Sequence, residues 1–288
     1  MKPFEYERAG DIGEALELLR AHGPGARILA GGQSLLPMLN LGLYEPEILI
    51  DIGSIPRLSD IEVSGDALVI GAMTRHRSVE LDDTVRSRQP LLADAIGHVG
   101  NTRVRNTGTV GGSIVHNDPA AELPLVMLVL DANYELTDGV SRRKVKAEDF
   151  GVGSFETSIR EGEVLTAVEV PTLASEWRWG FREFSYRPGD FAVAAAAVIA
   201  RFEGNELAEV HVGITGVGGG PVRCASFEEA ATGRSVDQLG EIESLVTTEV
   251  DYVMEGLESS EYRAHIAGVM TTRAIVDAFE RSREDNRS

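Results

Sequence analysis

Over the first 170 residues, short apolar runs typical of strands alternate with apolar positions at helical spacing. A helix is predicted at Asp11–Gly23, where Asp11 and Glu14 have the spacing of a capping box and Gly23 is placed to end the helix. Further strands are predicted at Arg27–Ala30, Glu47–Ile52, Ala67–Ala72, Ala132–Leu136 and Glu163–Val170, and helical segments at Leu35–Leu43, Leu91–Val99 and Leu123–Leu130. This half of the chain is therefore mixed α and β.

The pattern changes after the break Pro171–Ser175, which we take as a domain boundary. Beyond it, three strand-like runs predict an antiparallel sheet, with a hairpin turn at Glu203–Asn205. Segments of helical composition follow the loop Gly216–Pro221. The strands are expected at Phe181–Tyr186, Phe191–Phe202 and Ala208–Ile214, and the helices at Ser226–Ala231, Asp237–Leu257 and Glu261–Arg281. A sheet followed by helices indicates an α+β class.

The charge balance narrows the partners that the protein can have. The 288 residues include 46 acidic and 27 basic side chains, and the net charge of −19 repels nucleic acid and anionic lipid. The longest apolar stretch, Phe191–Ala200, is far shorter than the roughly 20 residues that cross a membrane. The first residues lack the apolar region of a signal peptide. We therefore expect a cytoplasmic protein with no nucleic acid partner and no membrane span.

Cysteine and histidine give little support for metal or nucleophile chemistry. The single cysteine, Cys224, excludes an intrachain disulfide and a four-cysteine iron–sulfur site, and it is expected to be a small buried hydrophobe. The six histidines lack the paired spacing of metal ligands, so each is expected on the surface or in the core. No G-x-S-x-G sequence surrounds Ser113, no Gly-Lys dipeptide allows a P-loop, and no G-x-G-x-x-G opens a helix. No metal site is predicted, and nucleophilic hydrolysis is disfavoured.

Two glycine-rich segments are the candidates for ligand binding. The first, Ala30–Pro37, follows a strand, and its glycines, amide and hydroxyl allow close approach to an anion, although an ordinary turn explains it equally well. The second, Arg103–Ser113, has three glycines among hydroxyl side chains and is expected to be a loop that can wrap a diphosphate. After it, Asp118 or Glu122 could accept a hydrogen bond from a ribose hydroxyl, and Asp118–Pro119 has equally the form of a helix start.

Together, the two segments resemble the paired FAD loops of the flavoprotein (medium) subunits of molybdenum hydroxylases, with the closest likeness to those of aerobic-type carbon monoxide dehydrogenases. The resemblance extends over nearly the whole chain. It is carried by Ala30–Pro37, Gly108–Ser113, Phe4–Tyr6, Arg187–Ala192, Glu261–Arg263 and Ala267–Met270.

The resemblance implies FAD as the cofactor and an architecture of two domains. An α+β FAD-binding domain of the vanillyl-alcohol-oxidase (PCMH) type is expected at 1–173, with subdomains at about 1–53 and 54–173. A smaller C-terminal domain with a three-stranded antiparallel sheet and helices is expected at 176–288.

Carried over position by position, the resemblance also implies which residues contact FAD. The wall on the diphosphate and adenosine side would contain Leu29, Ala30, Gly31, Gly32, Gln33, Ser34 and Leu35, and the second wall Thr109, Val110, Gly111, Gly112 and Ser113. Asp118 and Glu122 would lie near the ribose, where relatives commonly have an aspartate in place of Glu122. Leu165 and Arg182 would lie near the flavin ring, and Phe191 could shield the ring by packing without donating a hydrogen bond.

The function implied is electron transfer within a larger complex. A molybdenum-cofactor large subunit would oxidise the substrate, a [2Fe-2S] small subunit would carry the electrons, and FAD on this chain would pass them to an external acceptor. This chain then needs no catalytic acid or base, and the complex would be a dimer of heterotrimers.

Two alternatives stay open from the sequence. One is a stand-alone flavin-dependent oxidoreductase acting on its own small substrate, and the other is a binding or regulatory module that has lost FAD. The C-terminal domain is small and alanine-rich for a polar substrate pocket, which favours the subunit. Both glycine segments are intact, which disfavours the FAD-free module.

Overall fold

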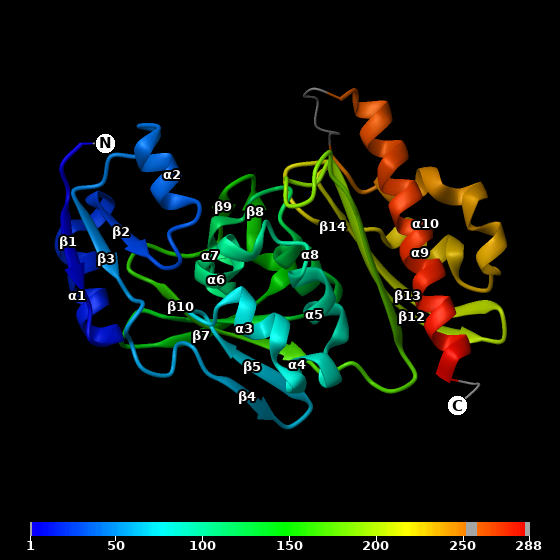
Figure 1. Ribbon diagram of the computed structural model, residues 1–288, viewed down its shortest axis with the longest axis horizontal. Coiled ribbons are helices and arrows are strands. Elements are labelled where there is room, and N and C mark those ends of the chain that lie inside the picture. The colour runs from blue at the N-terminus through cyan, green and yellow to red at the C-terminus, as the bar shows by residue number, and fades with distance from the viewer. Residues whose placement is uncertain (1, 252–257, 286–288) are drawn as a thin grey trace.

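The N-terminal subdomain is built on a small parallel sheet (Figure 1). The computed structural model describes residues 2–251 and 258–285. The sheet has the strand order β1-β3-β2, with β1 at Glu5–Arg8, β2 at Ala26–Leu29 and β3 at Ile48–Asp51. Three helical segments accompany it: α1 (Ile12–His22), the 3₁₀ turn η1 (Gly23–Gly25) and α2 (Leu35–Asn40). Because α1 packs on β2 and β3, the subdomain has its own small core.

The predicted start and end of α1 are confirmed. The Asp11 carboxylate accepts the backbone N–H of Glu14 at 2.9 Å, and the Glu14 carboxylate accepts that of Gly10 at 2.7 Å. Gly23 ends the helix with a φ of 47°, a conformation that favours glycine. The sequence did not predict β1, because its four residues are all exposed and form no apolar run.

The second subdomain has a five-stranded antiparallel sheet in the order β4-β5-β10-β6-β7. Its strands are β4 (Ile61–Ser64), β5 (Ala67–Gly71), β6 (Asn133–Thr137), β7 (Arg142–Lys146) and β10 (Val164–Pro171). Its helices are α3 (His76–Leu81), α4 (Asp83–Arg88), α5 (Pro90–Ile96), α6 (Thr102–Thr107), α7 (Val110–His116) and α8 (Glu122–Val129). The 3₁₀ turn η2 (Ala147–Asp149) and a hairpin of β8 (Gly151–Gly153) and β9 (Glu156–Thr157) complete the subdomain.

The C-terminal domain is a four-stranded antiparallel sheet with helices on its outer face (Figure 1). In sheet order the strands are β11 (Arg178–Phe184), β12 (Ala194–Glu203), β13 (Glu206–Thr215) and β14 (Val222–Arg223), so the short β14 adds a fourth strand to the three predicted. The helices are α9 (Ala225–Ala231), the 3₁₀ helix η3 (Val236–Thr247) and the long α10 (Ser260–Asp285). The predicted helix at Asp237–Leu257 is a 3₁₀ helix as far as Thr247, and residues 252–257 of it lie outside the described residues.

The alanine-rich strand β12 is buried on both faces. Ala194 and Ala196 belong to the core formed with α9, η3 and α10, whereas Ala195 and Ala197 belong to the core of the second subdomain. This alternation follows from the two-residue period of a strand. Helix α8 is buried throughout because it lies between the second subdomain and this sheet. The C-terminal sheet therefore closes against the rest of the protein.

Candidate functional site

A cavity of about 550 Å³ lies between the N-terminal subdomain and the second subdomain. One side is formed by the loop after β2 and by α2, and the other by residues of α3, α6, α7, α8 and β10. The loop before β12 forms one edge of the cavity. The predicted cofactor residues on its wall are Ala30, Gly31, Gly32, Gln33, Ser34, Leu35, Thr109, Gly111, Gly112, Ser113, Asp118, Glu122, Leu165 and Phe191. Folding thus brings the two glycine segments to one site.

The two segments touch at Gly31. A Cβ added there would lie 2.8 Å from the Cα of Gly108 and closer still to the Thr107 carbonyl oxygen, both of which are backbone atoms. A larger residue at position 31 would therefore separate the segments or distort their backbones. At the neighbouring Gly32, a φ of 70° turns the chain from β2 toward α2. Glycine here permits the close approach that forms the cavity.

The second glycine segment is largely helical, so the prediction of a loop over Arg103–Ser113 is wrong. The Asn101 side chain accepts the backbone N–H groups of the first turn of α6, and the Thr109 hydroxyl accepts the N–H of Gly112 in α7 at 3.1 Å. These two caps favour two short helices joined at Gly108. Because Gly111 has no side chain, α7 packs closely on Ala72 at the end of β5. The segment therefore forms part of the cavity wall instead of a free loop.

The carboxylates after this segment differ in their surroundings. Asp118 accepts the backbone N–H of Ala120 at 2.9 Å in a local turn, and α8 begins only at Glu122, so a helix start at Asp118–Pro119 is wrong. Glu122 is only 8% exposed. Burial, with smaller contributions from the nearby carboxylates of Glu183 and Asp118, raises the pKa of Glu122 to about 8. A protonated Glu122 on the cavity wall could donate as well as accept a hydrogen bond.

Leu165 and Phe191 give the wall apolar surfaces. Leu165 is buried in β10, next to a register shift in the pairing of β10 with β6. Phe191 lies in the loop before β12 and is 73% exposed. Both surfaces suit a planar aromatic group, and Phe191 leaves its own side open to solvent.

Three predicted contact residues do not line this cavity: Leu29, Val110 and Arg182. Val110 is fully buried in the core of the second subdomain. The guanidinium of Arg182 forms a bidentate pair with the Asp277 carboxylate of α10, at 2.6 and 2.7 Å. Because α10 packs along β11, this pair holds Arg182 on the outer face of the C-terminal sheet.

Other wall residues were not anticipated from the sequence, above all His76 and Tyr44. His76 begins α3 and is 4% exposed. Burial, with smaller contributions from Arg105 and Arg75, lowers its pKa to about 4. Tyr44 lies in the loop after α2, with the guanidinium of Arg27 5.1 Å from its ring centre. The only available signal for His76 was its place just after a predicted strand, where binding residues are frequent.

Within residues 2–251 and 258–285, no group of three histidine, cysteine, aspartate or glutamate side chains is placed to hold a metal ion. Cys224 is buried as predicted, and its thiol donates to the Val246 carbonyl at 3.2 Å. None of the helices in the same described ranges has the length and apolar character needed to span a membrane.

Comparison with known proteins agrees with this architecture. Residues 2–173 match the family model of the FAD binding domain in molybdopterin dehydrogenase, and residues 179–278 match that of the CO dehydrogenase flavoprotein C-terminal domain. The chain therefore belongs to the family of FAD-binding flavoprotein subunits of molybdenum hydroxylases. Its cofactor is FAD, and it is a subunit of an oxidoreductase.

Individual relatives match over almost their full length. The glyceraldehyde dehydrogenase medium chain of Sulfolobus acidocaldarius is 35% identical, with 94% of this chain and 97% of that one covered. The carbon monoxide dehydrogenase medium chain of Hydrogenophaga pseudoflava is 34% identical, with 96% and 98% covered. The solved structure of carbon monoxide dehydrogenase from Hydrogenophaga pseudoflava has a TM-score of 0.93 at 34% identity, with 98% and 99% covered. That of quinoline 2-oxidoreductase from Pseudomonas putida 86 has 0.91 at 32%, with 96% and 98% covered.

The residues present fit FAD by their chemistry. Glycines and hydroxyl groups from both segments can surround a diphosphate, and Glu122 can form a hydrogen bond with a ribose hydroxyl. Leu165 and Phe191 offer apolar surfaces to a flavin ring. The wall contains both kinds of surface that this dinucleotide requires.

Proposed function

We propose that this chain is the electron-transfer subunit of a heteromeric molybdenum hydroxylase. Electrons would arrive from iron–sulfur clusters on a partner subunit, reach FAD in the cavity and leave to an external acceptor. The observation that carries the proposal is the closure of the C-terminal sheet on both faces. A stand-alone flavoenzyme needs a substrate pocket beside its flavin, and in the domain that would supply one both faces of the sheet are covered by packed side chains.

The residues of this chain would bind and orient the cofactor. FAD supplies the ability to accept electrons one at a time and to release a pair. Gly31, Gly112 and Ser113 would hold the diphosphate, and Glu122 the ribose. Leu165 would pack on one side of the flavin ring and Phe191 on the other. Because Phe191 is largely exposed, it leaves the ring accessible to a redox partner from that direction.

The partners would be a molybdenum-cofactor large subunit and a [2Fe-2S] small subunit on separate chains, assembled as a dimer of heterotrimers. Relatives named as the alpha subunit of a 6-hydroxypseudooxynicotine dehydrogenase complex and the beta subunit of caffeine dehydrogenase support an assembly of several chains. Cys224, buried and alone, cannot hold an iron–sulfur cluster. The clusters must therefore come from a partner. We further propose a cytoplasmic location.

The test compares the isolated chain with the complex isolated from its native cells. The isolated chain is expected to bind FAD and to show the absorption bands of oxidised flavin. Carbon monoxide, purines, aldehydes and aromatic heterocycles should leave those bands unchanged. The complex should contain molybdenum, iron and FAD, and at least one of these compounds should bleach its flavin.

Two results would overturn the proposal. Bleaching of the isolated, metal-free chain by one of these substrates would identify a stand-alone flavoenzyme. A folded chain that binds no FAD, alone or with its native partners, would identify a module that has lost the cofactor.

A further inference from the structure

A buried histidine on the cavity wall has no role in the proposed function. His76 begins α3, and its backbone N–H donates to the Gly108 carbonyl at 3.0 Å, which fixes the residue beneath the junction of the two glycine segments. A Cβ added at Gly108 would lie 3.0 Å from Nδ1 of His76. The imidazole thus lies directly under the glycine that joins α6 to α7.

The ring nitrogens of His76 form no hydrogen bond of normal geometry within the described part of the chain. Neither Nδ1 nor Nε2 forms a hydrogen bond of normal geometry with any described residue, although the nearby Thr109 backbone partly offsets the effect of burial on its pKa. Such unpaired buried polar atoms cost folding free energy. Among the described side chains with unpartnered buried atoms, His76 is the one on the wall of this cavity. We therefore expect the ligand in the cavity to supply the hydrogen-bond partner of the His76 ring.

The surroundings of His76 favour an anionic group as that partner. The guanidinium groups of Arg75 and Arg105 both lower its pKa, which places positive charge around the ring. Arg75 donates to the Thr107 carbonyl, and Arg105 pairs with Glu80 at 2.9 Å and donates to the carbonyls of Val99 and Gly100. Arg75 and Arg105 are thus held in place near His76, outside the residues that line the cavity. An anion at the glycine junction would meet a positive potential there.

We infer that His76 is a cofactor-positioning residue that donates a ring N–H to the diphosphate of FAD at the junction of the two glycine segments. This inference rests on the proposed function, because it requires FAD in the cavity. A neutral imidazole has one donor and one acceptor, so it can give one hydrogen bond to a phosphate oxygen. The cost of the unpaired ring in the free chain is then recovered when FAD binds.

The experiment replaces His76 by leucine, which has a similar volume and no polar atom. In the full chain, His76→Leu should weaken FAD binding by about 10- to 100-fold, the usual loss for a hydrogen bond to a charged group. The melting temperature of the FAD-free chain should stay the same or rise, because an unpaired buried group has been removed. His76→Gln, which retains a donor, should recover part of the affinity.

A matched control is available at His211. It also has an unpartnered buried Nδ1, but it lies outside the cavity wall. His211→Leu should leave the dissociation constant for FAD unchanged. At saturating FAD, the absorption spectrum and reduction potential of the bound flavin should be the same in His76→Leu and wild type, because the contact is with the diphosphate.

Each other outcome overturns the inference. An unchanged FAD affinity in His76→Leu means that the ring does not contact the cofactor. A shifted flavin spectrum or potential means that it contacts the flavin ring instead. Weaker binding together with a lower melting temperature, without recovery in His76→Gln, means that His76 is structural. If wild type itself binds no FAD, the proposed function fails first, and the two failures are thereby distinguished.

Discussion

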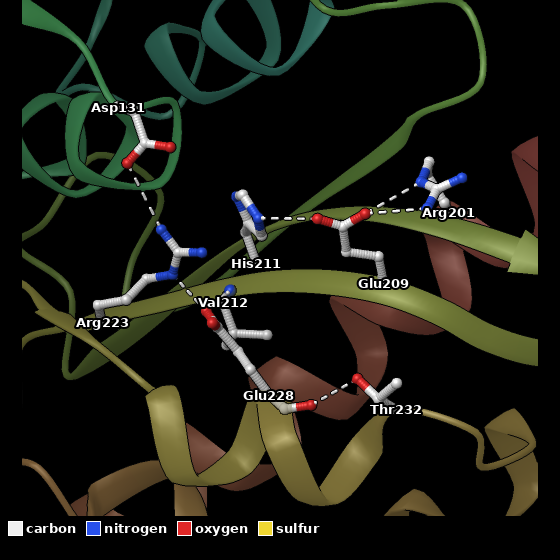
Figure 2. Close-up of polar contacts among 8 residues, drawn as sticks. All are labelled: Asp131, Arg201, Glu209, His211, Val212, Arg223, Glu228 and Thr232. Carbon is white, nitrogen blue, oxygen red and sulfur yellow. Dashed lines mark hydrogen bonds and ion pairs between the residues drawn. The ribbon is translucent and has the colours of Figure 1, made fainter.

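Two polar regions of this protein differ in how their buried groups are satisfied. The first, which we call the junction cluster, comprises Asp131, Arg201, Glu209, His211, Arg223 and Glu228 and lies where the C-terminal sheet meets the end of α8 (Figure 2). Arg223 pairs with Glu228 and lies 3.7 Å from Asp131, and Glu228 also accepts the backbone N–H of Val212 at 2.6 Å. Arg201 binds Glu209 at 3.0 Å. The charged groups here are paired within the protein, and among the six residues only Nδ1 of His211 is buried without a partner.

The second region is the wall of the FAD cavity, where burial is not matched by pairing. The ring of His76 forms no hydrogen bond of normal geometry with a described residue, and burial favours the neutral form of Glu122. Residues that only stabilise a fold tend to be satisfied, and exceptions concentrate at functional sites. The comparison therefore predicts that changes in the junction cluster alter stability without altering FAD binding. Polar changes in the cavity wall should alter FAD binding without lowering stability.

The largest effect is expected from Gly31→Val. The added side chain would collide with backbone atoms of Thr107 and Gly108, which cannot rotate away as the end of a flexible side chain can. Separation of the two segments should weaken FAD binding by at least about 100-fold. A titration of the flavin absorbance, with circular dichroism as a check of folding, measures this.

Gly240→Ala is the control for this substitution. Position 240 has no heavy atom within 4 Å of an added Cβ and lies in η3, away from the cavity. It should bind FAD as wild type does. If Gly31→Val also bound FAD normally, the contact between the glycine segments would not form the site.

The next effect is a loss of stability in Glu228→Ala. This change leaves the Val212 N–H without its acceptor and Arg223 with only the more distant Asp131, so we expect the free energy of unfolding to fall by about 3 kcal/mol. Chemical denaturation measures this loss, with the exposed neighbour Glu229→Ala as the control. The FAD dissociation constant should not change in either variant. A weakened FAD affinity in Glu228→Ala alone would contradict the separation of the two regions.

The contrast between these regions also explains what the sequence could predict. Helix α1 was predictable because its signals are local: Asp11 and Glu14 cap the start, and Gly23 ends it. Strand β1 was not, because all its side chains are exposed and backbone pairing with β3 alone defines it. Local signals predicted elements with an apolar face, and tertiary pairing created the others.

The residues of the candidate site were likewise predictable where the signal is local and not where it depends on tertiary packing. Gly31, Gly32, Gly111 and Gly112 were predicted as cofactor contacts from the sequence, because glycine permits close approach of the backbone to a ligand. His76 and Arg182 depend on which elements become neighbours. Burial beneath Gly108 gives His76 its unusual environment, and the packing of α10 against β11 directs Arg182 to Asp277. Neither consequence is present in the order of residues along the chain.

A gain of stability is expected from Glu122→Gln. The pKa of Glu122 is raised to about 8 from its ordinary value of 4.5, so between these values the folded chain holds a proton that the unfolded chain has released. Stability therefore falls as the pH rises through this window. In the FAD-free chain, Glu122→Gln should gain about 2 kcal/mol at pH 7 and nothing at pH 4.5, allowing for relaxation of the cavity wall.

Denaturation of both chains at pH 4.5 and pH 7 measures this gain. Glu183→Gln is the companion variant, because burial raises the pKa of Glu183 to about 7 although it is not on the cavity wall. It should show a smaller gain over a narrower range of pH. Equal pH dependence in Glu122→Gln and wild type would mean that Glu122 is ionised in the free chain.

The smallest effect is expected from Glu209→Gln in the junction cluster. Glu209 pairs with Arg201 and lies 3.7 Å from His211, but its side chain is 46% exposed and burial favours the neutral form of that histidine. A solvent-screened pair of this kind contributes about 0.5 kcal/mol or less. Removal of the Glu209 carboxylate should lower stability by no more than that, and a double-mutant cycle with Arg201→Met should give a coupling energy of the same size.

A coupling energy above about 1 kcal/mol would mean that the junction cluster acts as one network, since an isolated exposed pair does not reach that value. Stability would then depend on Glu209 as it does on Glu228, and the junction cluster would join the two domains as a unit.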